Sequence, residues 1–261
     1  MEMKLWENEI PYLLEDAETP NFFRTFFLKT AKPLPCVVVL PGGAYACRAP
    51  YEGNPIAEFF NTRGIHAIVV EYRVMPNRYP AALADVQRAI KILRANAKEW
   101  GIDPNRIVTC GFSAGGHLTA STLVLGDALP QDWSRDAIDA YPFLPNGGIL
   151  CYPVISIDDG YGHVGSGKNL LGERYEEMKE YLSLENRVTE NTPKAFLWHT
   201  SDDPVVNVKN SLSFAERLRD CGVQFEMHVY PHGEHGLALA LDREDVRGWA
   251  DLAANWVLKN I

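Results

Sequence analysis

The chain has 261 residues, of which 46% are apolar and 23% are charged, a composition typical of a soluble globular protein. Its net charge of −9, from 25 basic and 34 acidic residues, argues against nucleic acid or an anionic membrane surface as a partner. The five cysteines are widely spaced and include no CxxC pair, so neither a disulfide framework nor a zinc site is indicated. Residues 1–10 lack the apolar segment of a signal peptide, and no apolar run is long enough to span a bilayer, so we expect a cytoplasmic protein.

Short β-rich runs alternate with amphipathic helical patterns along the chain. Apolar runs predict strands at residues 22–29, 36–40, 66–70, 106–112, 147–151, 195–200 and 224–230. Apolar residues at three- and four-residue steps predict helices over about 80–97, 114–125, 212–221 and 249–257, with Leu212 and Leu252 on the buried stripes. We therefore expect an α/β fold in a single domain, residues 1–261, with helices on both faces of a mostly parallel central sheet.

Residues 153–192 do not fit this alternation. The segment is long, polar and rich in glycine, and we expect one short helix in it, around residues 175–182. Loops of this length in a compact domain are usually functional or disordered. We interpret this one as a small, cap-like insertion near the carboxyl edge of the sheet, over part of the site. The alternative is a surface excursion with no role in binding.

The pentapeptide Gly-Phe-Ser-Ala-Gly places Ser113 between a buried strand and a helix of small residues. The G-x-S-x-G motif is weak by itself, but the strand–turn–helix setting is the one that a nucleophile elbow requires. A serine on so sharp a turn has strained backbone geometry, and Gly111 and Gly115 leave the space that neighbouring side chains would occupy. We therefore predict that Ser113 is a nucleophile rather than a structural serine in a glycine turn.

A serine hydroxyl needs a base at neutral pH, and in the fold that carries this elbow an acid and then a histidine follow the serine along the chain. His232 and His235 share a loop after the last predicted strand; we favour His235, which a glycine and an apolar run follow, and keep His232 as the alternative. Asp202 and Asp203 follow the preceding strand, and we favour Asp203, with Asp202 as the alternative or as a turn residue. Four other histidines precede the serine, lie too close to it or fall inside expected strands: His66, His117, His199 and His228.

The loop PGGAY, residues 41–45, follows the first long buried strand. In lipases and esterases an HGGG-type loop at this point donates a backbone N–H to the oxyanion, and the residue after the nucleophile donates another. The candidate donors are the amides of Gly43, Ala44 and Ala114. The loop departs from HGGG at two positions, but main-chain donation tolerates this. Tyr45 comes next, and it either lines the acyl or leaving-group pocket or packs in the core.

Nearly the whole chain resembles the esterase and acetyl-esterase branch of the α/β-hydrolase superfamily. EYRV at residues 71–74 with YPAAL at 79–83 looks like the corresponding segment of hormone-sensitive-lipase-like esterases, and WGIDP at 100–104 before GFSAGGH is similar to bacterial acetylxylan esterase-like proteins. The resemblance implies an α/β-hydrolase fold and removal of a small acyl group, such as acetyl, from a sugar or xylo-oligosaccharide. We interpret Arg73 and Asp85 as a structural pair or a helix cap.

The expected reaction is a two-step acyl transfer in which Ser113 attacks the ester carbonyl, His235 takes its proton and Asp203 orients the imidazole. It needs neither a metal nor an organic cofactor. A peptidase or amidase of the prolyl-oligopeptidase kind has the same fold but usually carries another large domain, and a lipase is disfavoured because no long apolar lid segment is evident. A catalytically inactive binding protein of the same fold would lack one of the three residues, and all are present. Acyl-chain preference, natural alcohol and oligomeric state stay open, a homo-oligomer included.

Overall fold

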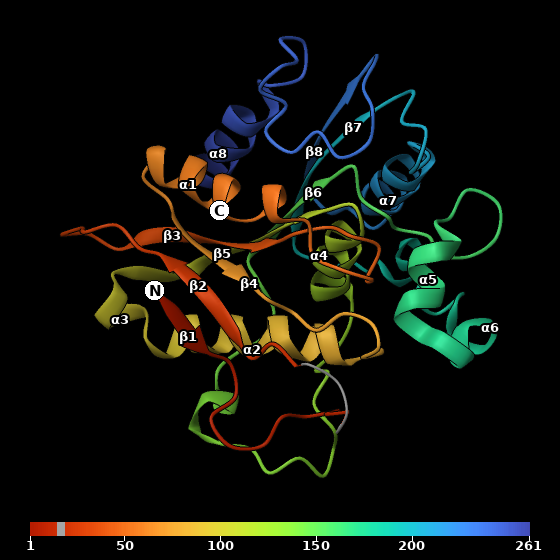
Figure 1. Ribbon diagram of the computed structural model, residues 1–261. Helices are drawn as coiled ribbons and strands as arrows, with labels where there is room; N and C mark the ends of the chain where they lie inside the picture. The colour runs from red at the N-terminus through yellow and green to blue at the C-terminus, as the bar shows by residue number, and fades with distance from the viewer. Residues whose placement is uncertain (15–18) are drawn as a thin grey trace.

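The computed structural model describes residues 1–14 and 19–261 and has an α/β architecture (Figure 1). Within these residues the strands form an eight-stranded sheet of order β1-β2-β4-β3-β5-β6-β7-β8. The strand β2 (Phe22–Phe26) runs antiparallel to both of its neighbours, β1 (Glu2–Lys4) and β4 (His66–Val70). The remaining pairs are parallel and add β3 (Leu34–Leu40), β5 (Ile102–Phe112), β6 (Gly147–Cys151), β7 (Lys194–Thr200) and β8 (Phe225–Tyr230). The predicted mostly parallel sheet is therefore confirmed.

Helices cover both faces of this sheet (Figure 1). One face packs against α1 (Asn54–Thr62) and α8 (Trp249–Asn260). The other face packs against α2 (Ala81–Ala95), α4 (Ala114–Val124) and α7 (Lys209–Asp220), and a short helix, α3 (Ala97–Trp100), follows α2. No helix in the described part of the chain is long and apolar enough to cross a membrane.

The strand β3 explains why several predicted strands are apolar throughout. Val37 and Val39 belong to the core under α1 and α8, whereas Cys36 and Val38 belong to the core under α2 and α4. Successive side chains of a strand point to opposite faces, so a strand that is covered on both sides needs apolar residues at every position. The CVVVL run therefore marks a central strand.

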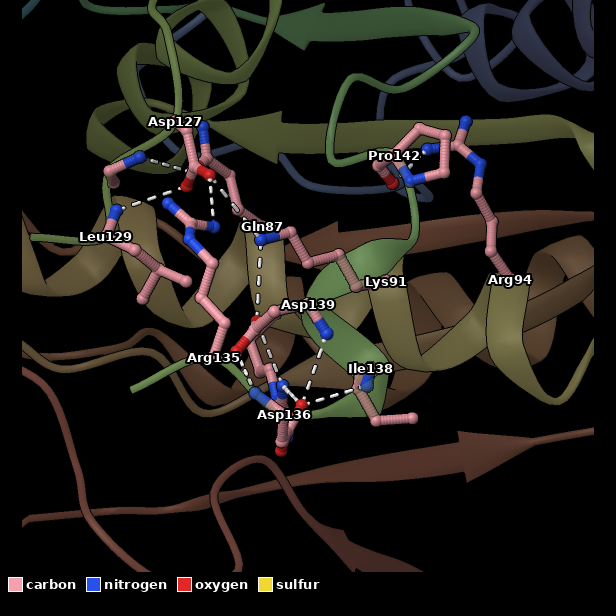
Figure 2. A network of polar contacts seen from close by, with 12 residues as sticks. Gln87, Lys91, Arg94, Asp127, Leu129, Arg135, Asp136, Ile138, Asp139 and Pro142 are labelled. Atoms are coloured by element: carbon pink, nitrogen blue, oxygen red, sulfur yellow. Dashed lines mark hydrogen bonds and ion pairs between the residues drawn. The ribbon is translucent and has the colours of Figure 1, made fainter. Parts of the chain in front are cut away.

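The helix α2 is buried along its outer side as well as its sheet-facing side. Residues 126–143, which include the 3₁₀ helix η2 (Ala137–Ala140), cover it. Arg88 lies 2.5 Å from Asp136 and 3.0 Å from Asp139. Lys91 lies 3.5 Å from Asp139 (Figure 2). Buried cations are tolerated where they are paired in this way. These ion pairs thus attach the covering segment to the helix.

The predicted pair of Arg73 and Asp85 joins the segment after β4 to the first turns of the same helix. Both side chains are fully buried, and Arg73 Nη2 lies 2.8 Å from Asp85 Oδ1. Asp85 also accepts a hydrogen bond from the indole of Trp6 at 3.0 Å. The interpretation of these two charges as a structural pair is confirmed.

Three helical segments differ from the sequence prediction: α7 and α8 each expose a leucine that was predicted to be buried, and residues 153–192 contain an additional helix. Leu212 is 48% exposed and Leu252 is 38% exposed, so assigning them to buried stripes was wrong. In α7 the polar Asn210 and Ser211 are buried instead, because they make hydrogen bonds with buried partners. Residues 153–192 hold a helix that the sequence analysis missed, α5 (Val164–Leu171), besides η3 (Gly172–Arg174), α6 (Tyr175–Met178) and η4 (Leu184–Arg187). The two glycines of α5 lower its helix propensity and hide its pattern.

Candidate active site

Ser113 lies at the sharp turn between β5 and α4, with φ of 53° and ψ of −118°. A residue with a side chain rarely adopts this conformation unless its surroundings hold it there. A Cβ on Gly111 would lie 2.0 Å from the carbonyl oxygen of Gly115, and one on Gly115 would lie 2.1 Å from that of Leu40. The Ser113 amide donates to the carbonyl of Cys151 at 3.0 Å. The turn therefore has the strained, glycine-dependent geometry expected of a nucleophile elbow.

The structure brings Ser113, His235 and Asp203 together. His235 Nε2 lies 2.8 Å from Ser113 Oγ, and His235 Nδ1 lies 2.7 Å from Asp203 Oδ2. A neutral imidazole with its hydrogen on Nδ1 donates to the carboxylate and accepts the serine hydroxyl. The three residues follow β5, β7 and β8, and the ends of parallel strands lie at one edge of the sheet. This geometry permits the serine to pass its proton to the imidazole.

Asp203 is held by a full set of donors, and its side chain is 0% exposed. Its Oδ1 accepts the amides of Val205 at 2.8 Å and Val206 at 2.9 Å, and His199 Nε2 lies 3.4 Å from its Oδ2. Burial raises the pKa of this carboxyl, but the hydrogen bonds with His199, His235 and the Val206 amide outweigh burial and hold the pKa well below its usual range. Asp203 is therefore ionised next to the imidazole.

The alternatives Asp202 and His232 pair with each other instead. Asp202 Oδ2 lies 2.8 Å from His232 Nδ1, and Asp202 Oδ1 accepts the amide of Gly233 at 2.8 Å. Their side chains are 51% and 74% exposed. Because this pair lies at the surface, the geometry favours Asp203 and His235 as the partners of the serine.

The loop with the predicted oxyanion donors lies against the serine. A Cβ on Gly42 would lie 3.0 Å from Ser113 Cβ and 2.7 Å from the carbonyl oxygen of Phe112. Gly43 and Ala44 have positive φ angles of 128° and 53°, so the loop turns sharply after β3. The third predicted donor, Ala114, is the first residue of α4. All three predicted donors thus belong to backbone that adjoins Ser113.

Tyr45 packs in the core. Its side chain is 1% exposed, and its hydroxyl lies 2.8 Å from His117 Nδ1, while His117 Nε2 lies 2.9 Å from the carbonyl oxygen of Leu182. Burial lowers the pKa of His117 to about 4. The neutral ring therefore donates from Nε2 to Leu182 and accepts at Nδ1 from Tyr45. Of the two roles open for Tyr45, the structure favours packing over lining a pocket.

Sequence reasoning missed a buried carboxylate beside the site. Glu52 ends the 3₁₀ helix η1 (Pro50–Glu52) and is 2% exposed. Its Oε2 accepts the amide of Gly42 at 2.7 Å, and its Oε1 accepts the hydroxyl of Tyr152 at 2.6 Å. The same hydroxyl accepts the amide of Ala238 at 2.9 Å. No local pattern predicts this burial, because the partners lie in three separate loops.

His163 is a second residue that the sequence analysis did not place. It precedes α5, and its Nδ1 accepts the amide of Ser166 at 3.1 Å, so the hydrogen of the neutral ring is on Nε2. Burial lowers the pKa of His163, and the charge of His235 lowers it further, whereas Asp203 raises it. The imidazole is therefore within electrostatic reach of both residues.

The cysteine thiols in the described part of the chain are free, and three of them are buried. Cys36, Cys110 and Cys151 are buried in strands, where they pack as small apolar side chains, and burial raises the pKa of the Cys36 thiol. Among the residues that the structure describes, no group of three or more His, Cys, Asp or Glu side chains is placed to hold a metal ion.

Known proteins resemble this chain over most of its length. The sequence model of the family described as BD-FAE matches residues 27–135. Endo-1,4-beta-xylanase B of Butyrivibrio fibrisolvens is 37% identical over 254 residues, which are 94% of this chain and 39% of that protein. An acetylxylan esterase of Xylanibacter ruminicola is 35% identical over 206 residues, 77% of this chain and 40% of that protein. The chain thus spans about two fifths of the length of these two curated relatives.

A solved structure is similar over both full chains. It is the acetyl ester-xyloside bifunctional hydrolase from Caldicellulosiruptor lactoaceticus, 42% identical, with a TM-score of 0.92. The match covers 98% of this chain and 94% of that one. At this identity and coverage the two proteins share a family as well as a fold.

Proposed function

Because the chain belongs to the esterase branch of the α/β-hydrolase superfamily, we propose that it hydrolyses short-chain carboxylic esters with Ser113 as nucleophile, His235 as general base and Asp203 as orienting acid. The observation that carries the proposal is the hydrogen-bonded series from Ser113 Oγ through the imidazole to the Asp203 carboxylate, at 2.8 Å and 2.7 Å. It starts on a strained elbow and ends on a buried, ionised acid.

The reaction proceeds in two steps. Ser113 Oγ attacks the ester carbonyl while His235 Nε2 takes its proton, and the carbonyl electron pair moves onto the oxygen. Amides of Gly43 or Ala44 and of Ala114 stabilise that oxyanion. The imidazolium then gives its proton to the leaving alcohol, and an acyl-enzyme remains. Water, activated by His235, releases the acid and regenerates the serine.

The substrate that fits best is an acetylated sugar, such as an acetylated xylo-oligosaccharide. Support comes from the relatives, since one is named as an acetylxylan esterase and another as an acetyl ester-xyloside hydrolase. A further support is Tyr51, which is 54% exposed and whose hydroxyl would lie 3.0 Å from a Cβ on Gly236, next to the base. An exposed aromatic ring with a polar tip suits a ligand that is partly apolar and partly hydroxylated.

We further propose that residues 153–192 form a cap-like part of this single domain. Asn169 of α5 donates from its side-chain amide to the carbonyl of Ala44 at 2.9 Å, which ties the segment to the oxyanion loop. Burial and the charge of His235 lower the pKa of His163, at the start of the same helix, and the charge of Asp203 raises it. These two observations support a role for the segment at the site.

The test is hydrolysis of a p-nitrophenyl ester series from acetate to octanoate, followed by release of acetate from acetylated xylo-oligosaccharides. We expect the acetate to be the best substrate, and Ser113→Ala to lower kcat by about 10⁴- to 10⁶-fold because the nucleophile is lost. Ser201→Ala is the matched control, since that exposed serine follows β7 and donates to the Pro231 carbonyl instead.

Three results would change the assignment. Rates that peak at longer acyl chains would remove the acetyl-sugar substrate and keep the esterase. Hydrolysis of peptides or amides in preference to esters would favour a peptidase of the same fold. A Ser113→Ala variant that matched the wild type on every ester would overturn the catalytic assignment.

A further inference from the structure

Glu52 is a buried acid whose two hydrogen-bond donors are both neutral. They are the Gly42 amide at 2.7 Å and the Tyr152 hydroxyl at 2.6 Å. Burial raises the pKa of Glu52 above its usual value, and these two hydrogen bonds and the nearby charge of His235 offset only part of that rise. Burying a carboxylate without a cation costs free energy, and such groups concentrate at functional sites. The position of Glu52 therefore needs an explanation beyond packing.

Each partner of Glu52 touches a reacting group of the proposed site. Gly42 is so near the nucleophile that a Cβ on it would lie 3.0 Å from Ser113 Cβ. Tyr152 stands edge-on to the imidazole of His235, with ring centroids 5.0 Å apart and planes at 70°. The Tyr152 hydroxyl also holds the amide of Ala238, in the loop that follows the base. One carboxylate thus connects the oxyanion loop, the end of β6 and the loop of the base.

We infer that Glu52 is a positioning residue for the proposed esterase site, with two effects that both come from its carboxylate. It fixes Gly42 and Tyr152 against the serine and the histidine, and its negative charge stabilises the imidazolium of His235. The catalytic meaning of this inference rests on the proposed function. Glu52 lies outside the G-x-S-x-G motif, the PGGAY loop and the loop of the base, which has the sequence PHGEHG at residues 231–236.

Several ionisable groups surround His235, and they differ in charge. Asp203 binds its Nδ1 and is ionised, and His163, which comes from the start of α5, is neutral at pH 7 because its pKa is lowered. The phenols of Tyr152 and of Tyr51, whose hydroxyl approaches Gly236, have raised pKa values and are neutral too. Glu52 is the second acid beside Asp203 in this group, and each of its two oxygens accepts a hydrogen bond, as the oxygens of a carboxylate do.

The charge of Glu52 matters at one moment of the reaction. When Ser113 Oγ forms its bond to the acyl carbon, its proton passes to His235 Nε2 and the ring becomes a cation. The same proton later leaves Nε2 for the departing alcohol. Glu52 exchanges no proton in either step. Its field acts between side chains that are only 2% and 15% exposed, and it lowers the energy of the cationic state.

The decisive measurement is the pKa of His235 itself, followed by the NMR signal of its imidazole C–H protons across a pH titration and assigned with His235→Ala. Glu52→Gln keeps the size of the side chain, and its amide accepts from Gly42 and donates to Tyr152. We expect this variant to lower the pKa of His235 by about one pH unit, a tenfold change in proton affinity. Glu244→Gln removes an equal charge from a side chain that is 88% exposed, and we expect no shift.

Kinetics on p-nitrophenyl acetate provide the second readout. Glu52→Gln should lower kcat/KM about tenfold, with KM nearly unchanged. In the plot of kcat/KM against pH, the fall at acidic pH (the acid limb) should move to lower pH by about one unit. Tyr152→Phe keeps the charge and removes a hydrogen bond, so it should lower kcat without moving the acid limb. Should Glu52→Gln fail to fold, Glu52→Asp replaces it: the charge remains, and the acid limb should stay at its wild-type position while kcat falls.

An unshifted His235 pKa in Glu52→Gln, or an acid limb that moves in Glu52→Asp, would overturn the inference and leave Glu52 with a structural role. Because the NMR titration needs no substrate, it separates this failure from failure of the proposed function. A shifted His235 pKa in a protein that hydrolyses no ester would leave the positioning role intact and reject the esterase.

Discussion

Two aspartate–histidine pairs lie side by side in this protein and differ in almost every physical respect except their hydrogen bond. Asp202 and His232 are 2.8 Å apart, and Asp203 and His235 are 2.7 Å apart. The first pair has side chains that are 51% and 74% exposed, and the second pair has side chains that are 0% and 15% exposed. Water screens the first pair, whereas the second acts in a medium of lower dielectric constant. Residue type and spacing thus leave the choice between the two pairs open, whereas burial and the contact with Ser113 distinguish the second pair from the first.

A single step along the chain separates the two aspartates. Asp203 turns inward, where the amides of Val205 and Val206 bind its Oδ1. Asp202 turns outward and binds the Gly233 amide, which secures the loop of the base. The pair at the surface therefore supports the loop, while the inner pair meets the serine.

Substitution of the histidines should give the largest difference in kcat between the two pairs. His235→Ala should lower kcat by about 10⁴- to 10⁶-fold on p-nitrophenyl acetate because the proton acceptor of Ser113 is lost. His232→Ala should stay within about threefold of wild type, as surface substitutions usually do. Initial rates of the purified variants check both values. Comparable losses in the two variants would mean that the two pairs do not differ in function.

Substitutions of the two aspartates should differ somewhat less in their effect on kcat. Asp203→Asn should lower kcat by about 10⁴-fold, since an amide in that place favours the wrong tautomer of the imidazole. Asp202→Asn should change kcat by no more than about threefold, because its partner is exposed and does not bind the serine. Thermal melting of both variants controls for folding. If Asp202→Asn were the slower enzyme, the assignment of the acid would have to be exchanged.

His117 sharpens the comparison as a buried histidine whose two ring nitrogens bind the Tyr45 hydroxyl and the Leu182 carbonyl in place of a carboxylate. Burial lowers its pKa to about 4, against 6.5 for an unperturbed imidazole. Between these values the unfolded chain binds a proton that the folded one does not, so the free energy of unfolding should fall as pH decreases from about 6.5 to about 4. At about 1.4 kcal/mol per pH unit the loss is on the order of 3 kcal/mol.

Urea unfolding at several pH values between 4 and 7 measures this loss. His117→Gln removes the titrating group, and its free energy of unfolding should depend less on pH than that of the wild type. His232→Gln is the matched control and should keep the wild-type dependence, because His232 is exposed. Equal slopes in the wild type and His117→Gln would contradict the expected role of burial.

Some of the site could be predicted because its signals are local. The GFSAG turn needs glycines on either side of Ser113 for steric reasons, and these reasons are visible in five consecutive residues. The run CVVVL predicts a strand that is covered on both faces, and the structure confirms it. The roles of Ser113, His235 and Asp203 follow from motif order and stay predictions, although the structure brings the three side chains together.

Other features depended on partners that are distant in the sequence. Leu212 was assigned to the buried stripe of α7 because leucine is apolar, yet Asn210 and Ser211 are buried there, bound to residues before α5 and in β7. Glutamate is a residue type that usually lies at the surface. Glu52 is buried because Gly42 and Tyr152 supply its hydrogen bonds. A polar side chain can be buried only where such partners meet it, and no local pattern records where they are.

The sequence by itself determined the alternation of strands and helices, the elbow at Ser113 and the two loops in which an acid and a base had to be sought. Only the tertiary structure decided which of two adjacent aspartates faces inward and which of two histidines meets the serine. It also decided that Glu52 is buried against Gly42 and Tyr152. The physical reason is one of range: backbone periodicity and glycine sterics act over a few residues, whereas burial and electrostatic pairing depend on segments that meet only after folding.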